Sequence, residues 1–222
     1  GVEVKLVPNG GKLEARFRGP SITPGYWRQP ELTRVAFDEE GFYRMGDALK
    51  FADPADPQQG LVFDGRVAED FKLATATWVD VGGLRMQLIL KGAPLVQDVV
   101  ITGHDRDYVG ALIFPVVSAC RELCTGLDPD APVAQVLGHP AVRGHFSRVL
   151  AELAAAESGS SRRVARAMLL EAPPSIDAGE ITDKGSINQR AVLACRAELV
   201  GEIYLDPPGN RVLVALQPDQ AH

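Results

Sequence analysis

The character of the chain changes within one stretch, Leu61-Val62-Phe63-Asp64-Gly65-Arg66-Val67-Ala68-Glu69-Asp70-Phe71-Lys72-Leu73 (residues 61–73). Its three leading residues are apolar and predict a strand, and the Asp64-Gly65 pair is typical of a turn that ends such a strand. We therefore place a domain boundary after Gly65, which divides the chain into residues 1–65 and residues 66–222. Strands and turns dominate the first part, whereas strands alternate with helices in the second.

The first part is predicted to be β-rich. Apolar residues alternate with charged ones over residues 2–6 and again over residues 13–17, which is typical of half-buried strands. Asn9-Gly10-Gly11 between them indicates a hairpin turn. A short helix is expected near Glu31 to Val35, before the segment that begins at Gly41.

The second part predicts a mixed fold. Strands are expected around residues 71–73, 77–81, 96–102 and 109–114, and helices over residues 119–127 and 139–156. The apolar pattern of residues 163–170 fits either a helix or a strand. A last helix is predicted from Ser186, whose side chain would cap it while Gln189 completes a capping box, to about Tyr204. The pattern as a whole predicts the α+β class.

Bulk composition excludes several kinds of partner. The 222 residues are 45% hydrophobic, enough for one large or two small cores, and the net charge of −6 disfavours nucleic acid and anionic membranes. No apolar run approaches the roughly 20 residues of a membrane span, and no signal peptide is expected. The three cysteines, Cys120, Cys124 and Cys195, lack zinc-site spacing and are expected to be reduced. We therefore expect a soluble cytoplasmic protein with no nucleic-acid and no membrane partner.

Four segments stand out as a group: residues 12–27, Gly41–Asp47, Asp64–Leu73 and Gly179–Asn188. In Gly41-Phe42-Tyr43-Arg44-Met45-Gly46-Asp47, a carboxylate follows a glycine that permits close approach, which suits two adjacent hydroxyl donors. In Gly179-Glu180-Ile181-Thr182-Asp183-Lys184-Gly185-Ser186-Ile187-Asn188, a lysine lies in a polar loop. Together the four segments resemble those of the adenylate-forming superfamily, which contains acyl-CoA synthetases, luciferases and adenylation domains.

The resemblance implies two residues that bind the nucleotide. Asp47 ends a segment similar to the family's Tyr-Arg-Thr-Gly-Asp motif, with Met45 where Thr is usual, and would accept hydrogen bonds from the ribose hydroxyls of ATP. Arg66 lies in a segment similar to the family's hinge motif and would hold the ribose and phosphate region with its forked guanidinium. A Gly-Asp pair alone is more often a turn, so the ribose role depends on the residues before it.

The resemblance also implies two catalytic lysines and a hinge. Lys184 would bridge the substrate carboxylate and the α-phosphate during adenylation, where a flexible ammonium stabilises the developing negative charge. Lys72 would enter the active site in the thioester-forming orientation. Ala68 occupies the hinge position, where Asp or Lys is usual, and needs only to absorb a dihedral change. The simpler interpretation of either lysine is a solvated surface charge.

Residues 61–85, 96–98 and 103–107 look closest to feruloyl-CoA synthases. On this resemblance, residues 1–65 are the β-rich end of a large N-terminal AMP-binding domain. Residues 66–222 are then a small, mobile C-terminal domain in which helices pack on short sheets. The implied reaction is that of an aryl-acid CoA ligase, with ATP and Mg²⁺, an aryl carboxylic acid and CoA as ligands. The sequence does not indicate an oligomeric state.

The chain begins at Gly1 inside a strand pattern, and the family's Ser/Thr/Gly-rich phosphate loop and acid pocket are not found in it. We therefore expect it to act with an N-terminal domain in cis and to have no ligase activity alone. The alternative is a stand-alone, non-catalytic binding or interaction domain derived from such an enzyme. Lys184 separates the two, since a structural relic does not need it. No metal site is expected, because His104 beside Asp105 and Asp107 is better explained as a surface loop.

Overall fold

A computed structural model describes residues 1–156 and 159–215 of the chain. The chain divides into two compact units, Gly1–Asp70 and Phe71–His222. The division lies a few residues beyond the boundary expected after Gly65. Arg66 is part of the last strand of the first unit, and Asp70 Oδ2 lies 3.0 Å from Lys12 Nζ of the same unit. Helices and sheets of mixed direction in the second unit confirm the predicted α+β class.

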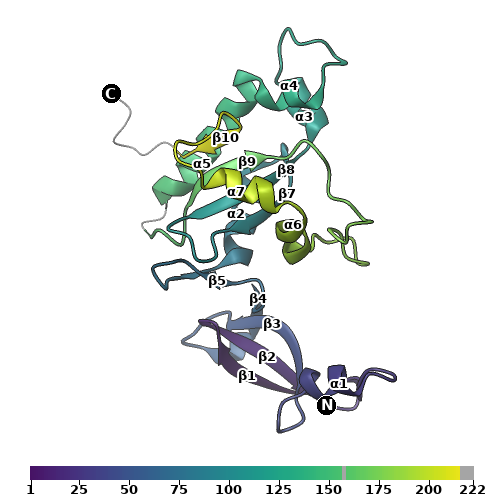
Figure 1. Cartoon of the computed structure of the whole chain (residues 1–222). Coiled ribbons are helices and arrows are strands. Elements are labelled where there is room, and N and C mark those ends of the chain that lie inside the picture. Colours follow the sequence, from purple (N-terminus) through teal and green to yellow (C-terminus); the bar gives the residue numbers. More distant parts are fainter. Residues whose placement is uncertain (157–158, 216–222) are drawn as a thin grey trace. The chain divides into compact units, whose positions relative to one another are not determined.

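The first unit is a four-stranded antiparallel sheet in the order β1-β2-β3-β4 (Figure 1). Its strands are β1 (Glu3–Asn9), β2 (Lys12–Arg18), β3 (Tyr43–Phe51) and β4 (Leu61–Arg66). The predicted hairpin is confirmed, since Asn9 pairs with Lys12 across the turn. The expected short helix is α1 (Pro30–Ala36), and a 3-10 turn, η1 (Pro57–Gln59), precedes β4.

The turn predicted at Asp64-Gly65 is wrong. β4 continues through both residues to Arg66, which pairs with Asp47 of β3. The pairing register between β3 and β4 shifts between Asp47 and Leu49. This irregularity accommodates Asp64 and Gly65 within the strand. The chain turns only afterwards, where the backbone N–H of Glu69 donates to the carbonyl of Arg66 at 3.1 Å.

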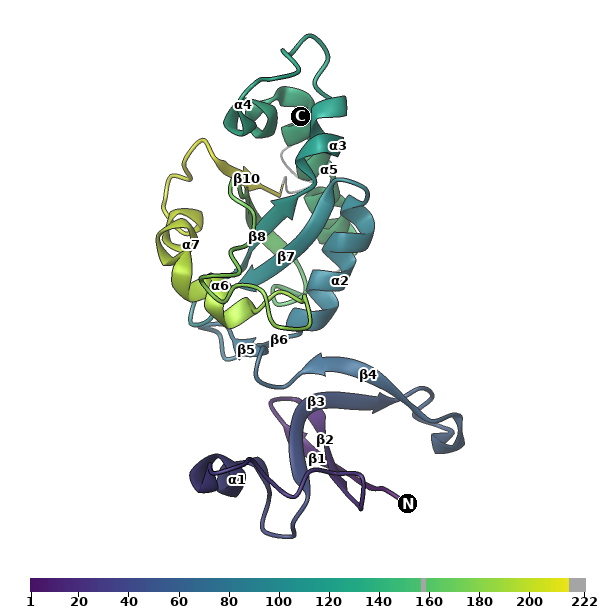
Figure 2. The same cartoon turned by 90° about the vertical axis from the view of Figure 1, so that its right-hand side faces the viewer.

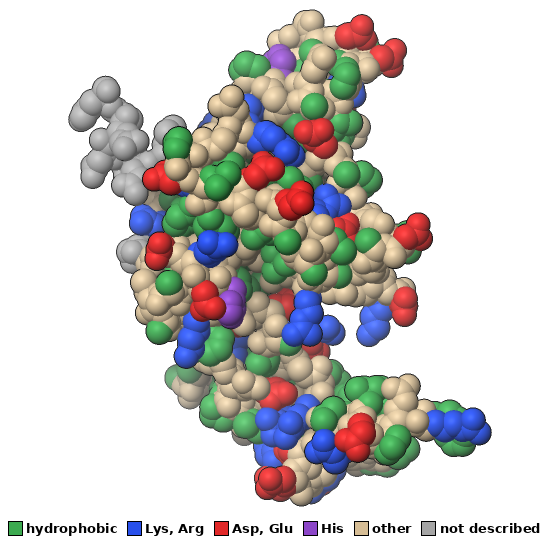
Figure 3. Space-filling view, viewed as in Figure 1, with side chains coloured by type: hydrophobic (Ala, Val, Ile, Leu, Met, Phe, Trp, Pro, Cys, Tyr) green, Lys and Arg blue, Asp and Glu red, His purple; other side chains and the backbone are tan. Residues whose placement is uncertain are grey.

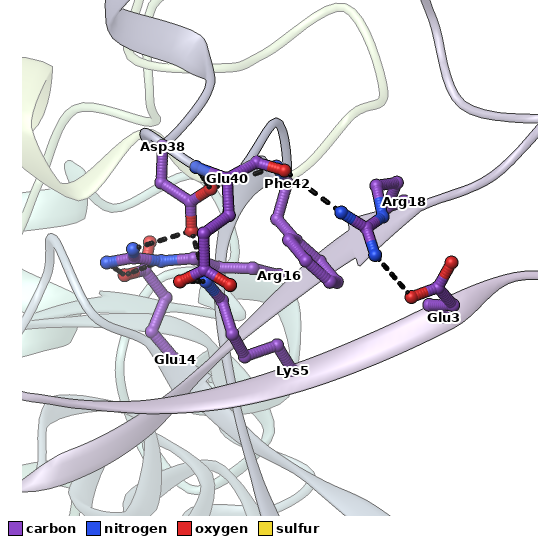
Figure 4. A network of polar contacts seen from close by, with 8 residues as sticks. All are labelled: Glu3, Lys5, Glu14, Arg16, Arg18, Asp38, Glu40 and Phe42. Atoms are coloured by element: carbon purple, nitrogen blue, oxygen red, sulfur yellow. Dashed lines mark hydrogen bonds and ion pairs between the residues drawn. The ribbon is translucent and has the colours of Figure 1, made fainter.

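A network of charged side chains holds the loop that leads into β3 (Figure 4). Asp38, whose side chain is 6% exposed, lies 2.8 Å from Lys5 Nζ and 3.1 Å from a guanidinium nitrogen of Arg16. Its other oxygen accepts the backbone N–H of Phe42 at 2.9 Å. The cations of Arg18 and Lys5 lie 4.3 and 4.5 Å from the centre of the Phe42 ring. These contacts fix the residues immediately before β3.

Asp38→Asn is expected to destabilise the first unit in a pH-dependent way. The hydrogen bond from Lys5, followed by those from Phe42 and Arg16, holds the pKa of Asp38 well below its usual range against the opposing effect of burial. A carboxyl group whose pKa is lowered by folding stabilises the folded state fully at pH values above its unfolded pKa of about 4. This stabilisation is lost as the pH falls through the folded pKa. Urea denaturation followed at the amides of β1 to β3 should therefore show a gap between wild type and Asp38→Asn that is constant near neutrality and shrinks in acid. Glu40→Gln, which alters a 69% exposed partner of Lys5, is the control. A gap that stays the same down to strongly acidic pH would contradict the proposed origin.

The second unit is built on a four-stranded sheet in the order β10-β9-β8-β7. β7 (Val96–Thr102) and β8 (Val109–Pro115) are antiparallel, and β8 and β9 (Val164–Leu169) are parallel. β10 (Val212–Val214) adds an antiparallel edge strand. A separate hairpin pairs β5 (Phe71–Lys72) with β6 (Trp78–Val79).

Helices cover both faces of this sheet (Figures 1 and 2). The helices of one face are α2 (Val81–Gly92), α3 (Val117–Glu122), α4 (Val133–Gly138) and α5 (Pro140–Ala156). Those of the other face are α6 (Gln189–Cys195) and α7 (Ala197–Ile203). Alternation along the strands supplies both cores, because Val99 and Ile101 of β7 belong to the first and Val100 to the second. The sheet is therefore the middle of three layers.

Several sequence predictions for this unit are confirmed and others need correction. The strands at residues 96–102 and 109–114 and the helix at 139–156 are confirmed, and the ambiguous stretch 163–170 contains the strand β9. The helix predicted over residues 119–127 is displaced toward the N-terminus, as α3. The strand predicted over 77–81 is only β6, because the Asp80 side chain accepts the backbone N–H of Gly83 at 3.0 Å and caps α2. The sequence patterns do not single out α2, α4 or β10.

The helix predicted from Ser186 to Tyr204 is two helices with a different cap. Asn188 caps α6, since its side chain accepts the backbone N–H of Ala191 at 3.3 Å. The hydroxyl of Ser186 lies instead 2.8 Å from that of Thr182, within the preceding loop. The break between α6 and α7 falls at Arg196, whose φ of −111° and ψ of 30° are not helical.

Candidate functional site

The two residues expected to bind the nucleotide lie side by side on the first unit. Asp47 of β3 and Arg66 of β4 are cross-strand partners, and Arg66 Nε is 3.3 Å from Asp47 Oδ1. The carboxylate is 24% exposed and the guanidinium 58% exposed, so both are open to a ligand. Gly46, at φ +80°, adopts a conformation that side chains disfavour, and its carbonyl accepts the N–H of Val67 at 3.0 Å. The strand pair thus presents an acceptor and a forked donor at one place.

Lys72 lies on the second unit, on the short β5–β6 hairpin. Its ammonium is 5.0 Å from the centre of the ring of Trp78, its cross-strand partner. Its carbonyl accepts the backbone N–H of Asp105, which attaches the hairpin to the loop between β7 and β8. That loop passes so close that a Cβ on Gly103 would lie 3.1 Å from the Phe71 ring and from the Tyr108 carbonyl. The backbone of Lys72 is therefore fixed while its exposed side chain reaches outward.

Ala68, the expected hinge residue, lies in the turn of residues 67–69 between β4 and β5. Its side chain is exposed, and this turn is the last part of the first unit before Asp70. An exposed small side chain places no packing restraint on the backbone dihedrals. The exposure of Ala68 and its place in a turn are compatible with a hinge.

Lys184 projects from a small hairpin between β9 and α6. An isolated bridge joins Ile181 to Ile187, and the backbone N–H of Thr182 donates to the carbonyl of Ser186 at 2.8 Å. The turn closes with the N–H of Gly185 donating to the carbonyl of Thr182 at 2.8 Å. Lys184 is exposed at the tip of this hairpin. A long cationic side chain on a closed hairpin can reach a ligand while its backbone stays in place.

The structure therefore brings together one of the two predicted pairs. Asp47 and Arg66 share one strand pair of the first unit. Lys72 and Lys184 belong to the second unit, on different elements: β5 carries Lys72, and the hairpin before α6 carries Lys184.

An ion pair at the base of the Lys184 hairpin was not predicted from the sequence. Arg196 binds the Glu180 carboxylate with both arms, Nε to Oε1 and Nη2 to Oε2, each at 2.8 Å. These hydrogen bonds, and one from the backbone of Ser175, hold the pKa of Glu180 below its usual value despite burial. In the sequence, Glu180 stands out only as a member of its motif. No local signal links it to Arg196, which lies beyond α6.

Other expected features are placed as follows. His104 is 72% exposed beside Asp105, in the loop between β7 and β8, which confirms the surface-loop interpretation. Over residues 1–156 and 159–215, no three His, Cys, Asp or Glu side chains are grouped as a metal site. None of the described helices combines the length and apolarity that crossing a membrane requires. On the face drawn in Figure 3, acidic and basic side chains are interspersed over the second unit.

The second unit matches a known family. Residues 80–207 match the family described as AMP-binding enzyme C-terminal domain. The matched range includes Glu180, Lys184 and Arg196, whereas Arg66 and Lys72 precede it.

Similar proteins extend this match over most of the chain. A chloroplastic long-chain-fatty-acid acyl-carrier-protein ligase of Arabidopsis thaliana is 25% identical over 205 residues, which are 90% of this chain and 26% of that protein. A probable CoA ligase of Humulus lupulus is 34% identical over 138 residues, 55% of this chain and 21% of that protein. The A domain of a carboxylic acid reductase from Segniliparus rugosus, solved with AMP and a co-purified carboxylic acid, has the same fold. It gives a TM-score of 0.68 at 24% identity and covers 92% of this chain and 31% of that one. The chain thus spans less than a third of each of these proteins.

Proposed function

The chain belongs to the AMP-binding enzyme C-terminal domain family, and from this premise we propose that it is the C-terminal part of an ATP-dependent acid–thiol ligase. The proposed reaction joins a carboxylic acid to ATP, giving an acyl-adenylate and diphosphate. The acyl group then passes to the thiol of CoA, with release of AMP. The main support is the exposure of Lys184 at the tip of a closed hairpin inside the matched region.

Three residues are proposed to act in the first step. Asp47 accepts hydrogen bonds from the two ribose hydroxyls, and Arg66 donates to the ribose and phosphate region from the neighbouring strand. Lys184 places its ammonium between the acid's carboxylate and the α-phosphate. It stabilises the negative charge that grows there as the carboxylate oxygen attacks phosphorus and diphosphate leaves.

The second step is proposed to follow a rotation of the second unit, Phe71–His222, about the segment near Ala68. Rotation would withdraw Lys184 and bring Lys72 to the acyl-adenylate, where the thiol of CoA attacks the acyl carbon and AMP leaves. Two features support this. Ala68 is exposed in the turn of residues 67–69, just before the first unit ends at Asp70, and Lys72 is carried on a hairpin that is bonded to the loop between β7 and β8.

Mg²⁺ is proposed to arrive with ATP, bound to its phosphates, where it would neutralise charge. The described residues offer no grouped set of three metal-binding side chains, so we assign none of them to the ion. The positive groups that this chain itself contributes toward the nucleotide are Arg66 and Lys184.

Exposed apolar surface on the first unit supports a larger N-terminal domain in the complete protein. The apolar side chains that residues 1–70 bury are those of Ala15, Phe42 and Ala48. Trp27 is 84% exposed and Phe63 64% exposed, together with other large apolar side chains of the same unit. A sheet with so small a core is poorly suited to a stand-alone binding domain, and its exposed apolar surface is typical of one that packs against further structure.

We propose an aryl acid of the feruloyl type as the substrate and CoA as the acceptor. Support for the acid comes from residues 61–85, 96–98 and 103–107, which resemble feruloyl-CoA synthases. Support for CoA comes from the similarity to a probable CoA ligase. A carrier protein is the competing acceptor, because another relative is an acyl-carrier-protein ligase.

The experiment compares the 222-residue chain with the complete protein that contains it. We expect the complete protein to form acyl-AMP and diphosphate from ferulate and ATP, and a thioester once CoA is added. The chain alone should form no acyl-AMP, because ribose contacts and one lysine do not position three substrates. Asp47→Asn in the complete protein should raise the KM for ATP.

The possible results separate the parts of this proposal. Acyl-AMP formation by the chain alone would contradict the need for an N-terminal domain. A strong preference for fatty acids over aryl acids would overturn the feruloyl assignment and leave the ligase function intact. Absence of acyl-AMP from the complete protein with every class of acid would favour a non-catalytic binding domain.

A further inference from the structure

The segment that carries Lys184 is anchored in an unusual way. Between Leu170, at the end of the sheet region, and Gln189, at the start of α6, Glu180 is the one buried residue. Its exposed fraction is 2%. Segments of this kind are ordinarily held by buried apolar side chains. Here the anchor is a carboxylate, and a buried carboxylate is retained only with a full set of partners.

Glu180 has such a set. Arg196 forms the two-armed pair with its carboxylate, and the backbone N–H of Ser175 donates to Oε2 at 2.7 Å. Its own backbone N–H donates to the carbonyl of Ser175 at 2.9 Å, and its carbonyl accepts the N–H of Asn188 at 2.8 Å. Every polar group of Glu180 is therefore used, and the residue joins both sides of the loop on which Lys184 lies.

Arg196 connects the same loop to the body of the unit. Its Nη1 donates to the carbonyl of Ala172 at 3.0 Å and its Nη2 to that of Pro173 at 2.8 Å. The guanidinium lies 4.8 Å from the centre of the Phe114 ring, on β8. Because a guanidinium is planar and holds several donors in fixed directions, it fastens the start of the loop and the base of the hairpin together.

The far end of the hairpin is fixed independently. Asn188, whose backbone N–H donates to the carbonyl of Glu180, also caps α6 with its side chain. The next residue, Gln189, is 6% exposed, and its side-chain oxygen accepts the backbone N–H of Ile101 on β7 at 3.2 Å. Both ends of residues 181–187 are thus attached to the central sheet, one through Arg196 and one through Gln189.

We propose that Glu180 and Arg196 are positioning residues that hold the hairpin so that Lys184 reaches the reacting groups from a fixed base. This inference rests on the proposed function of Lys184. Neither residue touches the substrates, and both act through the lysine. Loss of the pair leaves the ammonium chemically unchanged and lowers the fraction of time it spends in the productive position.

The test uses Glu180→Gln and Arg196→Lys in the complete protein. Glu180→Gln turns one acceptor toward Arg196 into a donor, and Arg196→Lys keeps the charge and loses the fork. We expect each to slow acyl-AMP formation on the order of 10- to 100-fold through kcat, as for small misplacements of a catalytic group. The KM values for ATP and acid, and the rate of thioester formation from supplied acyl-AMP, should change less than about twofold, since Lys184 acts in the first step alone.

A structural measurement on the same variants separates positioning from general loss of stability. Hydrogen exchange should become faster at the amides of Thr182, Gly185 and Asn188, while the amides of β7 and β8 keep their protection. Arg211→Gln is the matched control, because Arg211 is 49% exposed and its ion pairs with other described residues are long, at 3.6 and 3.9 Å. It should alter neither the adenylation rate nor the exchange of the hairpin.

A double variant that combines Glu180→Gln with Lys184→Ala tests whether the Glu180–Arg196 pair acts through the lysine. If the pair acts through the lysine, Glu180→Gln should add almost nothing to the defect of Lys184→Ala. Additive defects, equal slowing of both half-reactions, faster exchange throughout the sheet, or full activity of Arg196→Lys would each overturn the proposal and leave the role of Lys184 standing. A normal adenylation rate in Lys184→Ala would overturn the proposed function and the positioning role together.

Discussion

Lys184→Ala is expected to slow acyl-AMP formation by about a hundredfold or more, the usual result of removing one donor to a transition-state charge. The reason lies in where the charge grows. Attack by the acid on the α-phosphate of ATP concentrates negative charge on oxygens that water stabilises poorly in a closed site, and the ammonium supplies a fixed positive charge there. The effect should appear in kcat more than in KM, since the interaction strengthens as the reaction proceeds.

The same variant should capture CoA normally when acyl-AMP is supplied. We expect this because Lys184 lies on the hairpin before α6, a different element from the one that carries Lys72. Stopped-flow measurement of diphosphate release gives the first rate, and thioester formation from synthetic acyl-AMP gives the second. Lys91→Ala, which removes another exposed lysine of the same unit, is the control. Equal loss of both steps would count against the role assigned to Lys184.

Local patterns predicted those parts of the fold whose causes are local. The Asn9-Gly10-Gly11 turn and the alternation on either side of it specify the first hairpin, and the apolar spacing of residues 139–156 specifies α5. The strands at 96–102 and 109–114 were predictable because residues 99–101 and 109–114 are apolar on both faces, and helices cover both faces of their sheet.

The failures have tertiary causes. Asp64-Gly65 has the sequence of a turn, but pairing of Arg66 with Asp47 carries the strand past it. Ser186 and Gln189 have capping-box spacing, but Ser186 is bound to Thr182 and Gln189 to the backbone of β7, so Asn188 caps the helix. Arg66 and Gln189 are held by partners distant in sequence, and Ser186 is held by a hydroxyl four residues away. Each of these contacts competes with the expected turn or cap and replaces it.

The same division between local and tertiary causes applies to the residues of the candidate site. The motif segments single out Asp47, Arg66, Lys72 and Lys184 as candidates, and the side chain of each is at least partly exposed in the structure. The motifs did not reveal what holds Lys184, because Glu180 and Arg196 meet only once α6 has returned the chain to the base of the hairpin. The residues proposed to touch ligands lie in short motifs, whereas the contacts that hold the Lys184 hairpin depend on the three-dimensional fold.

Lys72→Ala is expected to slow CoA capture and to leave acyl-AMP formation nearly unchanged. On the proposed rotation, Lys72 faces away from the nucleotide during adenylation and faces the acyl-adenylate afterwards. Its side chain lies over the ring of Trp78, and the backbone beneath it is bonded to the loop between β7 and β8. It must therefore move with the whole second unit, and its contribution depends on the rotation rather than on local flexibility.

Ala68→Pro should uncouple the two steps by restricting that rotation. Proline fixes φ near −65°, removes a backbone donor and restrains Val67 before it, all within the turn of residues 67–69. One orientation should be trapped, so one half-reaction falls by at least about tenfold, as for other hinge changes that remove a conformational step, while the other is spared. Ala68→Gly, which frees the same dihedrals, should keep both steps and serves as the control. Pre-steady-state measurement of the adenylation burst and the thioester rate decides the matter. If Lys72→Ala lowers the adenylation burst as much as the thioester rate, this segment is not a hinge between two catalytic orientations. The same conclusion follows if Ala68→Pro leaves both rates unaltered.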